Sequence, residues 1–224
     1  MRLLLIRHGQ TPANVRGELD TAAPGPGLTE LGHAQAAAIP DALASERIDA
    51  IYVSQLARTQ QTAAPLARVH GEMRRIVLPG IHEIEAGRLE GRSDKRAVTA
   101  YLKTVRAWGD GKLGRRMPGA GDGHEFFSRF DVDVARVYEE QGADATVALF
   151  SHGAAIRIWT AVRARNATPE FPGRRHLDNT GVVTLEGSPP AGWFLADWHG
   201  EPAGGAALND PAAEDVTGES ELSG

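Results

Sequence analysis

The 224-residue sequence contains no cysteine. This absence excludes disulfide bonds, zinc sites built from thiolates and a cysteine nucleophile. The sequence also has no cluster of Asp and His residues at the spacing of metal ligands, so we expect neither a metal nor any other cofactor. Chemistry in this chain must therefore depend on oxygen and nitrogen groups.

Long hydrophobic runs are missing as well. Only four apolar residues, Leu3 to Ile6, directly precede Arg7, which is too few for the core of a signal peptide. No later run approaches the roughly 20 apolar residues of a membrane-spanning helix. From these absences we expect a soluble cytoplasmic protein with no membrane partner.

Basic residues are absent from the last 24 positions, which hold six acidic residues. Without this stretch the formal net charge changes from −5 to +1, because 24 basic residues then stand against 23 acidic ones. A nearly neutral body lacks the basic surface of a nucleic-acid-binding protein. We therefore expect no nucleic acid partner and a small polar ligand.

The acidic stretch, residues 201–224, is otherwise rich in Gly, Ala and Pro. Because it offers little apolar surface to bury, we expect it to be a disordered tail. The remaining residues, 1–200, have the length of one domain and can bury enough surface to fold without cross-links. The sequence therefore predicts a single domain followed by a tail.

Short apolar runs alternate with helical patterns along this domain. Strands are expected at residues 3–6, 49–53, 75–78, 144–150, 182–185 and 193–198. Helices are expected at residues 30–44, 56–69, 95–108, 125–140 and 153–165, with Thr29 as the N-cap of the first and Pro40 kinking or splitting it. This order predicts an α/β fold, a three-layer α/β/α sandwich around a mainly parallel sheet.

The first strand is followed by an unusual group, Arg7-His8-Gly9. Residues 144–150 are followed by Ser151-His152-Gly153, which repeats the pattern of apolar strand, histidine and glycine. In open α/β sheets, ligands bind beyond the carboxyl ends of the strands. If these two strands are neighbours in a parallel sheet, His8 and His152 face each other across one crevice.

Other charged residues occupy equivalent positions. Arg58 lies in the first turn of the helix after the second strand, Glu83 lies in the loop after the third, and Asn14 follows the first motif closely. Guanidinium groups match the oxygens of phosphate, and the helix that begins near Gly153 would direct backbone N–H groups to the same place. We interpret the set as a site for a tetrahedral dianion, with a neutral imidazole as the nucleophile and a carboxyl group completing the mechanism.

Five motifs, in this order, resemble those of the histidine phosphatase superfamily, in its phosphoglycerate mutase-like branch. They span residues 1 to about 185. The motifs are Arg7-His8-Gly9-Gln10-Thr11 with Asn14, Leu28-Thr29-x-x-Gly32-x-x-Gln35-Ala36, Ser54-x-x-x-Arg58-x-x-x-Thr62-Ala63, Ile81-x-Glu83-x-x-x-Gly87-x-x-Glu90-Gly91 and Ser151-His152-Gly153.

The resemblance implies a phosphoglycerate mutase-like fold and a metal-independent phosphatase that hydrolyses a small phosphomonoester. It implies that His8 attacks phosphorus and becomes a phosphohistidine, while Glu83 protonates the leaving oxygen and later activates water. The implied catalytic residues are His8, Glu83 and His152. The implied phosphate ligands are Arg7, Asn14, Arg58 and Gly153, with His152 also contacting the phosphoryl group.

Several assignments stay open at this point. Composition does not separate Glu83 from Glu85, and only the Glu-x-x-x-Gly spacing favours Glu83. We interpret Glu85 and Glu90 as solvated loop charges. The family's Gly-Glu-Ser segment is missing, and Gly123-His124-Glu125 is the nearest stretch. The loops at residues 12–27 and 109–123 are expected to read the rest of the substrate, whose identity stays open, as does a homodimer.

Rival functions are less well supported. A phosphoglycerate mutase would carry a doubly basic, proline-rich insert, of which only residues 113–118 are reminiscent. A serine hydrolase elbow around Ser151 needs glycine at position 149, which is leucine. Asp131-Val132-Asp133 resembles an aspartyl-phosphate motif but lies in a helical pattern, so we interpret both as exposed helix carboxylates. A binding protein without turnover would have no use for the acid.

Overall fold

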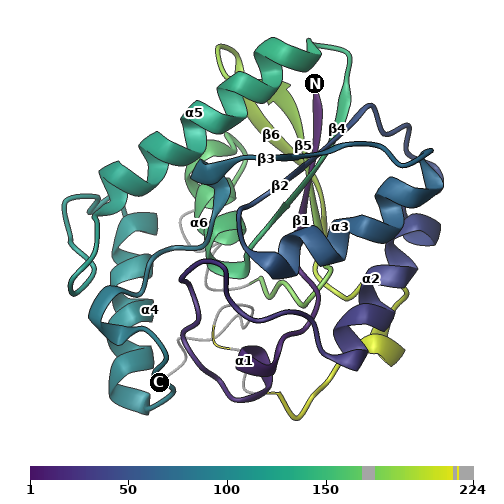
Figure 1. Ribbon diagram of the computed structural model, residues 1–224. Coiled ribbons are helices and arrows are strands. Elements are labelled where there is room, and N and C mark those ends of the chain that lie inside the picture. Colours follow the sequence, from purple (N-terminus) through teal and green to yellow (C-terminus); the bar gives the residue numbers. More distant parts are fainter. Residues whose placement is uncertain (168–174, 214–215, 217–224) are drawn as a thin grey trace.

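The computed structural model describes residues 1–167, 175–213 and 216. Its centre is a six-stranded sheet with the order β3-β2-β4-β1-β5-β6 (Figure 1). The strands are β1 (Arg2–Arg7), β2 (Ala50–Val53), β3 (Arg75–Val77), β4 (Thr146–Ser151), β5 (Val182–Ser188) and β6 (Gly192–His199). The first four run parallel, and β5 and β6 are antiparallel additions at one edge. The predicted mainly parallel sheet is confirmed.

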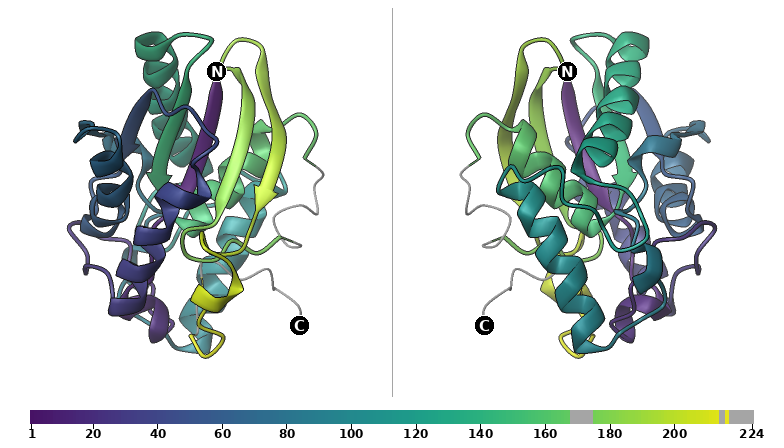
Figure 2. Two further views of the ribbon diagram at one scale, coloured as in Figure 1. Left: turned by 90° about the vertical axis from the view of Figure 1, so that its right-hand side faces the viewer. Right: turned by 90° about the vertical axis from the view of Figure 1, so that its left-hand side faces the viewer.

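Helices cover both faces of this sheet (Figures 1 and 2). One face carries α2 (Glu30–Ala42) and α3 (Ala57–Val69), and the other carries α4 (Lys95–Gly109), α5 (Gly123–Gln141) and α6 (Gly153–Arg163). Strand side chains alternate between the two cores: Leu3 and Leu5 point to one, and Leu4 and Ile6 to the other. The three-layer sandwich expected from the sequence is therefore present. Among the described residues, no helix is long and apolar enough to cross a membrane.

Strand register brings the histidine motifs to the same level. In the parallel pair of β1 and β4, Arg7 lies opposite Ser151. The backbone N–H of His8 donates to Ser151 O at 3.1 Å, and that of Ser54, just past β2, donates to Phe150 O at 3.1 Å. The expectation that the two histidine-bearing strands are neighbours is confirmed, and the motif that starts at Ser54 begins at the same edge of the sheet.

Helix α2 begins where the sequence predicts. Thr29 is its N-cap, and the hydroxyl of Thr29 accepts a hydrogen bond from Gly32 N at 3.0 Å. The helix is not split at Pro40 but continues to Ala42. Because Pro40 lies in the last turn, its missing N–H removes a single helical hydrogen bond close to an end that frays anyway.

The C-terminal segment differs from the expected disordered tail over its first part. Ala203 is buried, and its N–H donates to Thr180 Oγ1 at 3.1 Å. The side chain of Gln35 donates to Leu208 O at 2.8 Å, and that of Gln10 donates to Asp210 at 3.0 Å. Polar contacts with the domain therefore order residues 201–213 although the segment has little apolar surface. The rest of the expected tail, apart from residue 216, lies outside the described residues.

Candidate active site

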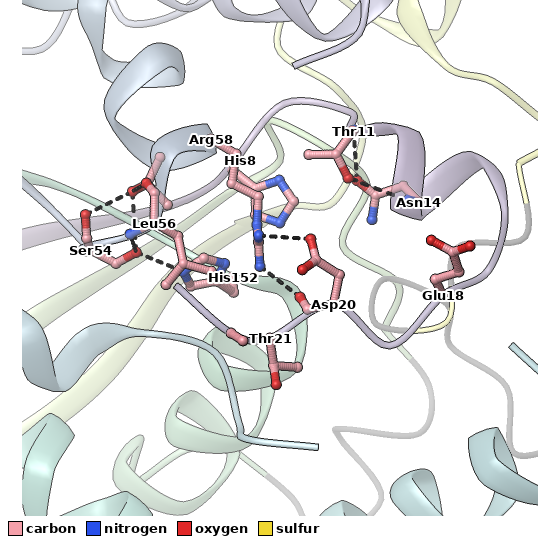
Figure 3. Close-up of polar contacts among 12 residues, drawn as sticks. His8, Thr11, Asn14, Glu18, Asp20, Thr21, Ser54, Leu56, Arg58 and His152 are labelled. Carbon is pink, nitrogen blue, oxygen red and sulfur yellow. Dashed lines mark hydrogen bonds and ion pairs between the residues drawn. The ribbon is translucent and has the colours of Figure 1, made fainter. Parts of the chain in front are cut away.

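Five of the sequence-predicted site residues meet beyond the carboxyl ends of β1, β2 and β4. Arg7, His8, Arg58, Glu83 and His152 are each at most 3% exposed. The rings of His8 and His152 face each other at a centroid distance of 5.1 Å, with an angle of 59° between their planes. Figure 3 shows the two rings beside the Arg58 side chain. The structure thus gathers two cations, two imidazoles and one carboxyl group in a site shielded from water.

The tautomer of His8 follows from its hydrogen bond. Its Nδ1 lies 2.8 Å from Gly9 O, and a carbonyl oxygen only accepts, so Nδ1 carries the proton. Burial lowers the pKa of His8 well below its ordinary value, and the charges of Arg58 and Arg7 lower it further. The ring is therefore neutral at physiological pH, and its lone pair is on Nε2. This is the form of imidazole that can attack an electrophile.

Two glycines let α2 pack closely against the turn that follows His8. A Cβ atom on Gly9 would lie 2.7 Å from Gly32 O, and a Cβ atom on Gly32 would overlap Gln10 O. The N–H of Gly9 also donates to Thr62 Oγ1 at 2.9 Å. The spacing from the first motif to Gly32 and Thr62 therefore reflects direct contacts that hold the backbone next to His8.

His152 is held by Ser54, the first residue of the motif that contains Arg58. Its Nε2 lies 2.7 Å from Ser54 Oγ, whereas Ser54 Oγ and Thr59 Oγ1 are 3.2 Å apart (Figure 3). When Ser54 donates to Nε2, the proton of the neutral ring is on Nδ1. Among the described residues Nδ1 has no partner. His152 can thus donate from Nδ1 to a bound oxygen, and burial lowers its pKa well below the ordinary value.

The two arginines are anchored differently. Arg7 donates from Nη1 to Leu177 O at 2.7 Å, just before β5. Arg58 donates from Nη1 to Asp20 Oδ2 at 3.1 Å and from Nη2 to Asp20 O at 2.9 Å. Asp20 lies in the loop that follows α1 (Pro12–Val15), and the sequence did not single it out. Both guanidinium groups are therefore held by contacts made far along the chain.

Asn14 forms part of a capping box at the start of α1. Its Oδ1 accepts from Thr11 N at 2.9 Å and from Thr11 Oγ1 at 3.0 Å. Asn179 donates to His8 O at 3.0 Å and approaches Asn14 Oδ1 at 3.4 Å. Asn179 was also missed, and its signal was a polar turn, Asp178-Asn179-Thr180-Gly181, before a strand that pairs with β1.

Glu83 rather than Glu85 is the buried carboxyl group. Glu83 accepts from Ile84 N at 2.8 Å, Ala154 N at 3.1 Å and Ala155 N at 2.9 Å. The side chain of Glu85 is 58% exposed. Burial raises the pKa of Glu83, although these hydrogen bonds and Arg58 oppose the rise. Two N–H groups of the α6 terminus near Gly153, those of Ala154 and Ala155, are thus bound to Glu83.

Helix α5 positions the loop that carries Glu83. Arg129 donates to the carbonyl oxygens of Gly80, His82 and Glu83, and Asp133 accepts from Gly80 N. Asp131 accepts from Trp159 and Arg163. The interpretation as exposed helix carboxylates was therefore wrong for Asp133, which is buried, whereas the side chain of Asp131 is 37% exposed and pairs with Arg163. Alternating polar positions in a helical pattern do not show which loop packs on them.

Replacing Gly80 with alanine should destabilise the protein, because a Cβ atom there would overlap Arg129 O and lie 2.7 Å from Asp133 Oδ2. The expected loss of unfolding free energy is about 1–3 kcal/mol. Thermal unfolding measures it, and Gly114→Ala is the matched control because nothing lies within 4 Å of a Cβ atom at that position. Equal melting temperatures for the two variants would contradict the close contact.

Glu90, in the loop that also carries Glu83, is not the solvated charge expected from the sequence. It accepts from Thr21 N at 2.7 Å and from Ala22 N at 3.0 Å, and it also binds the Thr21 hydroxyl. Glu90 therefore ties the 12–27 loop to the Glu83 loop instead of being a solvated charge. The 109–123 loop also reaches this segment, since Arg88 N donates to Pro118 O at 2.8 Å. Among the described residues, no three His, Asp or Glu side chains are placed to hold a metal ion.

Comparisons with known proteins agree with this architecture. The family model described as histidine phosphatase superfamily (branch 1) matches residues 3–199. The PE-PGRS family protein PE_PGRS11 of Mycobacterium tuberculosis is 40% identical over an alignment that covers 94% of this chain but only 38% of that protein. The metal-independent phosphoserine phosphatase of Arabidopsis thaliana is 25% identical over 88% of this chain and 80% of its own length.

A solved structure shows the same fold. The mycobacterial glucosyl-3-phosphoglycerate phosphatase in complex with VO3 superposes with a TM-score of 0.75 at 24% identity, covering 89% of this chain and 99% of that one. The family match extends over nearly the whole domain and includes all the motifs that meet at the site. This chain therefore belongs to branch 1 of the histidine phosphatase superfamily.

Proposed function

We propose that this protein is a metal-independent phosphatase that hydrolyses a small phosphomonoester through a phosphohistidine on His8. The observation that carries the proposal is the state of His8, a buried neutral imidazole with its lone pair on Nε2, beside Arg7 and Arg58. Relatives support the class of reaction, because several bear names of phosphatases for phosphoserine, α-ribazole phosphate and glucosyl-3-phosphoglycerate.

In the first step, His8 Nε2 forms a bond to phosphorus while the bond from phosphorus to the ester oxygen breaks. Glu83, whose pKa is raised by burial, transfers its proton to the departing oxygen. Arg7 and Arg58 offset the negative charge of the phosphoryl oxygens, and His152 donates to one of them from Nδ1. Phosphoryl transfer depends mainly on such positioning and charge stabilisation.

In the second step, the Glu83 carboxylate takes a proton from a water molecule that attacks phosphorus. The bond between phosphorus and His8 Nε2 breaks, and inorganic phosphate forms. Glu83 is then protonated and His8 neutral, as at the start. Asn14 and the backbone around Gly153 complete the proposed phosphate ligands.

The test is hydrolysis of p-nitrophenyl phosphate and of a panel of phosphomonoesters in excess EDTA. We expect the purified protein to release phosphate at a rate that EDTA leaves unchanged. The panel includes phosphoserine, sugar phosphates and 3-phosphoglycerate, and the last is also assayed for mutase activity. Activity lost on chelation would contradict the mechanism. Isomerisation without net hydrolysis would point to a mutase, and inactivity with tight phosphate binding would point to a binding protein.

A further inference from the structure

Arg58, one of the two arginines in the proposed phosphate site, forms an ion pair with the carboxylate of Asp20. Arg58 is 2% exposed, and its Nη1 and Nη2 donate to the carboxylate and backbone oxygens of Asp20 (Figure 3). Gly25 closes the same side, because a Cβ atom there would lie 2.7 Å from Arg58 Nη1. The loop from Asp20 to Gly25 thus encloses the outer end of the guanidinium group.

Asp20 leaves the third nitrogen of the guanidinium group, Nε, unused. Arg58 Nε is buried and has no hydrogen-bond partner among the described residues. A buried N–H without a partner is costly, and it indicates a place that a ligand oxygen fills. Asp20 therefore holds Nη1 and Nη2 in one orientation, while Nε has no protein partner among the described residues.

The charge of Asp20 acts on the same arginine. Its carboxylate attracts Arg58, while Glu18, Glu90 and Arg16 are the other charged groups near enough to influence it. The Asp20 side chain is 19% exposed, so water screens it only in part. A phosphate dianion bound at Nε would meet a guanidinium group whose positive charge is already partly offset.

We propose that Asp20 is a positioning residue that orients Arg58 toward the phosphoryl group and, through its negative charge, weakens the hold of the site on inorganic phosphate. The inference rests on the proposed function, because it concerns release of that reaction's product. Turnover requires phosphate to leave after each cycle. The carboxylate of Asp20, bound to Arg58, lowers the affinity of the site for phosphate and keeps the orientation of the Arg58 side chain.

The test measures binding of inorganic phosphate by isothermal titration calorimetry to the wild type, Asp20→Asn and Glu18→Gln. Asparagine keeps an oxygen for Arg58 but removes the charge, so we expect its phosphate Kd to fall by about tenfold, allowing for partial screening. Glu18→Gln removes the same charge two positions away, where the carboxylate pairs with Arg16. Its Kd should stay within about twofold of the wild type, because that charge is exposed and screened.

A merely structural role would not tighten phosphate binding. An unchanged or higher Kd in folded Asp20→Asn would overturn the proposal, as would an equal fall in Glu18→Gln. If Asp20→Asn does not fold, Asp20→Ser is judged by the same criterion. Absence of phosphomonoester hydrolysis by the wild type would instead contradict the proposed function, so the two failures are distinguishable.

Discussion

Replacing His8 with alanine should lower the hydrolysis of phosphomonoesters by at least about 10⁴-fold, as is typical when a covalent nucleophile is removed. No neighbouring group can substitute, because Nδ1 of His152 is the donor in the proposed mechanism and its Nε2 is held by Ser54 at 2.7 Å. The measurement is the initial rate of p-nitrophenyl phosphate hydrolysis in EDTA. In addition, the wild-type reaction is quenched without acid, and intact-protein mass spectrometry detects a phosphorylated form of the enzyme.

His33→Ala is the matched control, because His33 is exposed on α2, the helix that packs against the turn after His8. It should retain wild-type rates. The His8→Ala variant should still be folded, which thermal unfolding checks. Substantial hydrolysis by folded His8→Ala would rule out His8 as the nucleophile, as would a phosphorylated form of that variant on the same time scale.

Glu83→Gln should lower kcat by about 10²–10⁴-fold for alkyl phosphates, the usual contribution of a positioned general acid. The loss should be smaller for p-nitrophenyl phosphate, whose leaving oxygen needs less help from a proton donor. Glutamine keeps the shape but presents an amide group toward N–H donors of Ala154 and Ala155, so some stability is also lost. The comparison of kcat across leaving groups separates the chemical role from that loss.

The same residue sets the direction of the pH dependence. Burial raises the pKa of Glu83, so the acid form persists to higher pH than in water, and the lowered pKa of His8 keeps its ring neutral down to low pH. The rate of the first step should therefore fall as pH rises through the pKa of Glu83. Glu83→Gln should lose this limb, and Glu85→Gln, whose side chain is exposed, should keep it. A wild-type rate that keeps rising at strongly alkaline pH would contradict these roles.

Most of the fold could be predicted because its signals are local. Apolar runs mark the strands, Thr29 marks the start of α2, and polar groups directly after the strands mark the edge where a ligand binds. The spacing of the motifs then indicated the family. Because β1 and β4 pair in parallel, the rings of His8 and His152, 144 positions apart in the sequence, face each other, as expected for neighbouring strands.

Other features could not be predicted because they depend on partners remote in sequence. In the sequence, Glu90 and Asp133 look like solvated carboxylates. Their roles become visible only in the tertiary structure, where Thr21 N donates to Glu90 and Gly80 N donates to Asp133. Residues 201–213 lack apolar surface, yet amides of Gln10 and Gln35 bind them. Burial and hydrogen bonding at such positions are set by which segments meet.

The sequence by itself determined the order of strands and helices along the chain and the edge of the sheet where Arg7, His8, Arg58 and His152 gather. These follow from residues adjacent to elements that form locally. Only the tertiary structure decided that Glu83 is buried while Glu85 is exposed, and that Asp20 holds Arg58. The physical reason is that the protonation state and orientation of a side chain depend on desolvation and on hydrogen-bond partners, and here packing brings those partners from distant loops.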